Sequence, residues 1–107
     1  MKYKRSNINP IRETEAVLWD GKNQLEGTLI LTRQALAFRQ HAFPKGHLHW
    51  EVQLQDIKEL QTFLLYGMAS NGMRITSISG REDLFVITEP GGFIHAIRKA
   101  QERQKNF

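Results

Sequence analysis

The chain of 107 residues carries a net charge of +4 and 40% apolar residues, which suits one domain with one hydrophobic core and argues against a disordered chain. It has no cysteine, which excludes a disulfide scaffold, a thiolate metal site and a cysteine nucleophile. Its longest apolar run without a charge, 63–69, is far shorter than the about 20 residues of a membrane-spanning helix, and no apolar stretch follows the basic N-terminus as in a signal peptide, so we expect a cytoplasmic protein.

Seven short runs of alternating apolar and polar residues are separated by regular turn signals, a pattern typical of an all-β meander. The predicted strands are 14–20, 24–32, 35–41, 48–54, 57–66, 72–79 and 83–88. No helix is expected within 24–66. In the second strand Gly27 lies on the leucine face, which predicts a bend or a close approach of another backbone.

Turn chemistry predicts how several of these strands are joined. The short connection at Arg33-Gln34 favours a hairpin between the second and third strands. The Asn71-Gly72 dipeptide is a hairpin signal between the fifth and sixth strands, and 79–82 turns the chain before the seventh.

After Pro90 the apolar period changes from 2 to 3.6, which predicts one amphipathic helix over about 91–105. Together the elements predict a mainly β domain, a bent seven-stranded antiparallel sheet or partly open barrel closed by the C-terminal helix. Both tryptophans, Trp19 and Trp50, are interpreted as core residues. The other side chains expected in the core are Leu29, Leu31, Leu36, Phe38, Val52, Leu54, Ile75, Phe85 and Ile97.

Three segments resemble one known family. The stretch 26–38, EGTLILTRQALAF, is similar to the opening of GRAM domains, and 52–60, VQLQDIKEL, is similar to a later segment of that family. The strands 72–76 and 83–87 match its Gly-aliphatic and aromatic-Phe strands, so the resemblance covers about residues 14–100. It implies the pleckstrin-homology-like superfold, with a basic segment 1–12 before a single domain 13–107.

The resemblance implies a binding module rather than an enzyme, because many GRAM domains bind phosphoinositides or partner proteins. The chain looks most like the short stand-alone members, of bacterial type. Lipid-binding pleckstrin-homology domains place several Lys and Arg in the first hairpin, but here Lys22 stands between Asp20 and Glu26, with Arg39 and Lys45 further on. A tight phosphate grip is therefore not expected.

Our leading hypothesis is a non-catalytic interaction module that binds itself or a protein partner. The run after residue 62 is apolar at both alternating positions, so one face of the fifth strand needs a cover. The predicted partner-binding residues are Phe63, Leu64, Tyr66 and Met68.

The alternative is a peripheral membrane adaptor held by basic ends. Residues 1–12 carry four basic and no acidic side chains, and 98–107 carry four basic and one acidic, whereas 13–97 carry seven basic and ten acidic. Such ends favour weak contact with an anionic surface over specific nucleic-acid binding, which uses a basic stripe on the folded body. The candidate contacts are Lys2, Lys4, Arg5, Lys22, Arg98, Lys99 and Arg103.

Residues with catalytic or metal-binding chemistry are sparse. His41, His47 and His49 lie close in sequence, and alternate strand positions can share a metal, but no carboxylate or thiolate other than Glu51 is close by. No serine stands in a nucleophile elbow, and no glycine loop is followed by Lys and Ser/Thr. We therefore expect the protein not to be an enzyme and to need no cofactor, metal or small-molecule substrate. Whether His41, His47 and His49 bind a metal is a question that the sequence leaves open.

Overall fold

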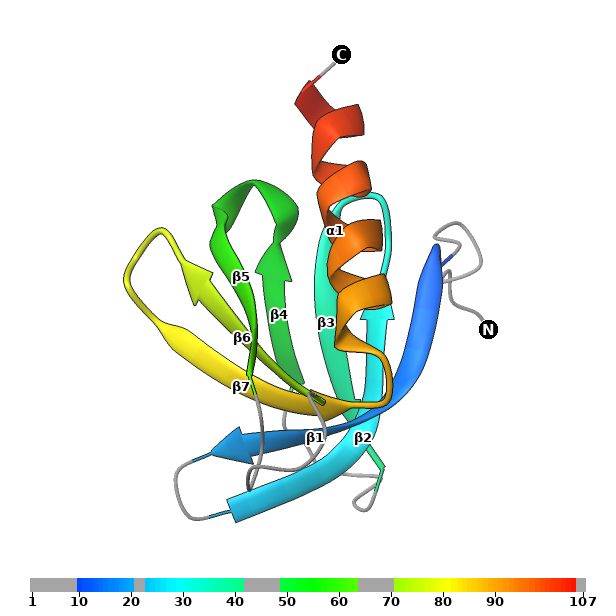
Figure 1. Cartoon of the computed structure of the whole chain (residues 1–107), viewed down its shortest axis with the longest axis vertical. Coiled ribbons are helices and arrows are strands. Elements are labelled where there is room, and N and C mark those ends of the chain that lie inside the picture. Colours follow the sequence, from blue (N-terminus) through cyan, green and yellow to red (C-terminus); the bar gives the residue numbers. More distant parts are fainter. Residues whose placement is uncertain (1–9, 21–22, 42–48, 64–70, 106–107) are drawn as a thin grey trace.

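A computed structural model describes residues 10–20, 23–41, 49–63 and 71–105. Seven antiparallel strands form one sheet in the order β4-β3-β2-β1-β7-β6-β5, curled into a half-barrel with one C-terminal helix along its open side (Figure 1). The strands and the helix are β1 (Arg12–Asp20), β2 (Asn23–Leu31), β3 (Ala35–Gln40), β4 (His49–Gln53), β5 (Ile57–Phe63), β6 (Gly72–Ser77), β7 (Glu82–Ile87) and α1 (Pro90–Lys105). The predicted fold class is confirmed.

Neighbouring strands β2 and β3 form the expected hairpin, with Leu31 opposite Leu36. The backbone approaches Gly27 closely, because a Cβ built there would lie 2.7 Å from Cζ of Phe38 and 2.9 Å from the carbonyl carbon of Arg39. The β6–β7 connection turns as predicted, with Gly80 at a φ of 94°, in the left-handed region that favours glycine.

One hydrophobic core fills the inner face of the sheet and the contact with α1. Phe38, Phe85 and Phe93 are almost completely buried, and Phe85 packs against Trp50 with the ring centroids 5.0 Å apart. Of the expected core residues, only Trp19 and Val52 are not fully buried; each is half-buried. Trp19 was assigned wrongly because it alternates with Leu18, and Leu18 takes the inner position on β1.

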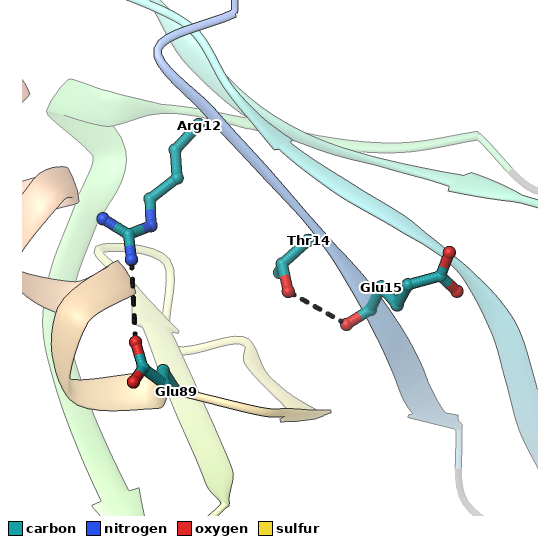
Figure 2. A network of polar contacts seen from close by, with 4 residues as sticks. All are labelled: Arg12, Thr14, Glu15 and Glu89. Atoms are coloured by element: carbon teal, nitrogen blue, oxygen red, sulfur yellow. Dashed lines mark hydrogen bonds and ion pairs between the residues drawn. The ribbon is translucent and has the colours of Figure 1, made fainter.

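Side chains of α1 also donate hydrogen bonds to carbonyls where the sheet turns its corner. The Gln101 amide donates to the carbonyls of Leu54 (2.9 Å) and Ile57 (3.2 Å), and the Gln104 amide donates to that of Arg33 (3.1 Å). At the other end of the helix the Arg12 guanidinium lies 3.9 Å from Glu89 (Figure 2). It also lies 6.0 Å from the centre of the Phe93 ring. The helix is therefore held to the sheet by polar contacts as well as by its apolar face.

Three local predictions need correction. A single 3-10 turn, Leu54–Asp56, lies where no helix was expected, because the chain turns sharply from β4 into β5 there. β6 ends at Ser77, two residues earlier than predicted. Asn71-Gly72 is not a two-residue hairpin turn, since Gly72 already lies in β6 opposite Phe63.

Candidate interaction surface

The outer face of the sheet, opposite the core, carries a group of apolar side chains brought together by strand register. Val17 lies opposite Val86, and Trp19 lies opposite Leu84, across the β1–β7 pair. All four side chains are half-buried, and they alternate with the fully buried Ala16, Leu18, Phe85 and Ile87. Cross-strand neighbours of this kind lie about 4.5–5.5 Å apart, so they form one continuous surface.

Phe63 extends this surface across β6. Its backbone pairs with Gly72, which in turn pairs with Val86, so Phe63, Gly72, Val86 and Val17 form one row across four strands. A Cβ at Gly72 would lie 2.6 Å from a ring carbon of Phe63, which shows that the ring covers the glycine. We call the side chains Val17, Trp19, Phe63, Leu84 and Val86 the outer patch.

Arg74 lies beside the outer patch, with its guanidinium 5.9 Å from the centre of the Phe63 ring. It also donates a hydrogen bond to Oε1 of Gln61 at 3.1 Å. Phe63 itself is half-buried at the end of β5, and Arg74 is its cationic neighbour.

The two apolar faces were expected from Phe63 onward, and the described part of β5 ends at that residue. Within its described residues only Ile57 and Leu60 are buried, while Lys58, Glu59 and Gln61 are exposed. The apolar residues that prompted the prediction, Leu64, Tyr66 and Met68, lie outside the described residues. Phe63 is thus the one predicted partner-binding residue that the structure places.

Of the basic residues predicted to contact an anionic surface, the structure describes only the three on α1. Arg98, Lys99 and Arg103 are exposed. Arg98 also donates a hydrogen bond to the carbonyl of Leu60 at 3.3 Å, so it contributes to helix docking. The remaining predicted contacts lie outside the described residues; they are Lys2, Lys4, Arg5 and Lys22.

Of the three histidines, the structure describes the side chain of His41 alone. Nε2 of His41 lies 2.8 Å from Oγ1 of Thr28, a hydrogen bond between the end of β3 and β2. His47 lies outside the described residues, and His49 is placed in β4 by its backbone. Among the described residues, no group of three or more His, Asp or Glu side chains has metal-binding geometry.

A separate hollow of about 570 Å³ lies between β4 and the β6–β7 turn. Arg81 sits at its edge, 6.0 Å from the centre of the Trp50 ring, with its Nε 3.2 Å from Oδ2 of Asp83. The buried Nε1 of Trp50 has no hydrogen-bond partner among the described residues.

Sequence comparison finds no matching family model and no matching curated protein. Solved structures do match. The C-terminal domain of an unknown protein from Leishmania infantum is similar at a TM-score of 0.77 with 12% identity, over 89% of this chain and 85% of that one. The Vps36 N-terminal PH domain is similar at a TM-score of 0.68 with 17% identity, over 98% of this chain and 87% of that one.

Among the residues that the structure describes, no helix is long and apolar enough to cross a membrane. The strand order, the curled half-barrel and the C-terminal helix agree with the similarity to a PH domain over nearly the whole chain. The chain has a pleckstrin-homology-like fold.

Proposed function

We propose that the protein is a non-catalytic protein-interaction module that binds a second copy of itself or a protein partner through the outer patch. The observation that carries the proposal is the row of apolar side chains on the sheet face opposite the core, extended by Phe63. The resemblance to GRAM domains, which include protein-binding members, supports the same function. Leu64, Tyr66 and Met68 follow Phe63 directly in the sequence and are proposed to belong to the same surface.

The physical reason is the cost of leaving such a surface in water. Contiguous apolar patches on a soluble protein usually mark interaction sites, and aromatic side chains at their centre supply most of the binding energy. The outer patch contains one tryptophan and one phenylalanine. The helix α1 does not cover the outer patch: it packs against β5 and the 3-10 turn, and its buried side chains belong to the core on the opposite face of the sheet.

The test uses the double variant Leu84→Thr/Val86→Thr, which removes apolar area while keeping residues that favour strands. The matched control is Ile30→Thr, because Ile30 is also half-buried on the outer face but lies opposite Glu13, away from the outer patch. We expect the double variant to weaken self-association in sedimentation velocity, or binding of the co-purifying protein, at least tenfold. The control should associate like the wild type.

The sequence-based version of the test replaces Tyr66 and Met68 with glutamate, which should abolish association and leave the fold intact. A wild-type chain that is monomeric and co-purifies with no protein would refute the proposal. So would unchanged association in the double variant.

The alternative function, a peripheral membrane adaptor, has support from the three exposed cationic side chains of α1. Basic residues near an anionic surface contribute about 1 kcal/mol each, and salt screens this attraction. The triple variant Arg98→Gln/Lys99→Gln/Arg103→Gln should then lose co-sedimentation with phosphatidylserine vesicles. Equal co-sedimentation with neutral vesicles would exclude this function.

A further inference from the structure

A shallow hollow of about 230 Å³ opens at the edge of the outer patch. Val17 and Val86 provide apolar lining and face each other across the β1–β7 pair. Glu26 pairs with Val17 from the other side, on β2, and Glu15 lies two residues from Val17 on β1, so both carboxylates belong to the same face. We call the lining formed by Glu15, Val17, Glu26 and Val86 the acidic hollow.

Among the described residues, no positive side chain pairs with the two carboxylates of the acidic hollow. Both glutamates are exposed, and in the described part of the chain neither carboxylate has an ion pair or a hydrogen bond. Of the basic side chains on this face, Arg74 is held by Gln61 and Phe63. Arg39 also lies on this face, on β3 opposite Thr28, which in turn lies opposite Glu15, and it forms no ion pair with either glutamate among the described residues.

His41, which lies next to Thr28, already forms hydrogen bonds through both its ring and its backbone. The His41 ring bonds Oγ1 of Thr28 at 2.8 Å, and the His41 backbone N–H donates to the carbonyl of Glu26. Glu15 and Glu26 are diagonal neighbours across the β1–β2 pair, so a cation placed between them would stabilise both. The charge on this edge of the outer patch therefore complements a basic group.

Another member of the lining points to a hydrogen-bond donor. Asn71 lines the hollow, and its buried Oδ1 has no hydrogen-bond partner among the described residues. An amide oxygen accepts from N–H groups, which both lysine and arginine carry.

The size of the hollow favours a single side chain over a drug-sized ligand. Small-molecule pockets have volumes of about 300–1,000 Å³, and the acidic hollow is below this range. A single long side chain fits better. Lysine and arginine lay an aliphatic stem along an apolar surface while the charged end reaches polar groups, which matches valine lining with glutamates at the edge.

We propose that the acidic hollow receives a lysine or arginine side chain from a segment of a different protein, whose neighbouring apolar residues cover the outer patch. This inference rests on the proposed function and adds the chemistry of the partner. The hollow supplies the charge selectivity, and the outer patch supplies the apolar contact area.

The experiment selects displayed random nonapeptides on the immobilised full chain and measures the strongest binders by fluorescence anisotropy. We expect the binders to share a Lys or Arg beside an apolar residue, and to bind less well at 0.5 M than at 0.05 M salt. Replacing that Arg by citrulline, or that Lys by norleucine, removes the charge but keeps the length. The replacement should weaken binding about 2- to 20-fold, since two exposed ion pairs are lost.

The protein side of the test is the double variant Glu15→Gln/Glu26→Gln. Its matched control is Glu13→Gln/Glu59→Gln, which changes the net charge equally at exposed positions outside the hollow. Only the first variant should lose peptide affinity, by the same 2- to 20-fold. Circular dichroism and thermal melting check that both variants are folded.

The inference is overturned if no peptide is recovered, if the binders lack a shared basic residue, or if both double variants bind alike. It is also overturned if the wild type is a homodimer that becomes monomeric in Glu15→Gln/Glu26→Gln and also in Lys2→Ser/Lys4→Ser/Arg5→Ser. The basic side chain in the acidic hollow then comes from a second copy of the chain. The variant Leu84→Thr/Val86→Thr tests the proposed function independently of the acidic hollow. If this variant loses association, the proposed function stands whatever the peptide results; if it associates like the wild type, the proposed function is refuted.

Discussion

Gly27→Ala tests the packing of the β2–β3 hairpin most directly. The added Cβ would collide with the backbone carbonyl group of Arg39, lying 2.9 Å from its carbon, and with the Phe38 ring, 2.7 Å from Cζ. Phe38 is only 1% exposed and packs against Phe85 at a centroid distance of 5.6 Å, so its ring has little room to move. The strands must separate locally to admit one methyl group.

The expected cost follows from overpacking, about 1–3 kcal/mol, and the upper part of that range applies because one of the opposing groups is backbone. A domain of this size is stable by about 5–15 kcal/mol, and each kcal/mol lowers the melting temperature by about 4–8 °C. We therefore expect the melting temperature to fall by about 8–20 °C, measured by circular dichroism and checked by urea unfolding.

The matched control is Gly91→Ala, where nothing lies within 4 Å of the added Cβ and the residue is in the first turn of α1. Alanine favours a helix over glycine by up to about 1 kcal/mol, so the control should melt at the same temperature or higher. A Gly27→Ala protein that melts like the wild type would show that the close approach of the two strands is not a constraint on this fold.

Three further predictions concern the same scaffold. Gln101→Ala should lower the free energy of unfolding in urea by about 1–3 kcal/mol, because the carbonyls of Leu54 and Ile57 each lose a side-chain donor; Gln101→Glu, which cannot donate, should cost at least as much. Truncation after Pro90 should produce an aggregating chain without a cooperative melting transition, since each lost core side chain contributes about 1.5–3 kcal/mol; a sharp transition in a monomer would contradict this. Gly72→Ala should destabilise less than Gly27→Ala, because the added Cβ meets the movable ring of Phe63 rather than backbone, and equal losses in melting temperature would argue against that distinction.

Local sequence patterns predicted most of the inner face of this protein, with Trp19 as the exception. The alternation of Leu29 and Leu31, and of Leu36 and Phe38, places these side chains in the core because successive strand residues point to opposite faces. The change to a period of 3.6 after Pro90 likewise predicted the helix and its buried Ile97. These features depend only on neighbouring residues.

The outer patch depends on pairing between strands far apart in the chain. β1 pairs with β7, and β7 with β6, so Val17, Val86 and Phe63 share one row although up to 69 positions separate them. Alternation within β1 could not show which of Leu18 and Trp19 faces the core, because both are apolar. Likewise, Asn71-Gly72 has the composition of a turn, but the Phe63 ring packed over Gly72 explains the glycine. Long-range register sets which residues meet, and that register is a property of the assembled sheet rather than of any segment alone.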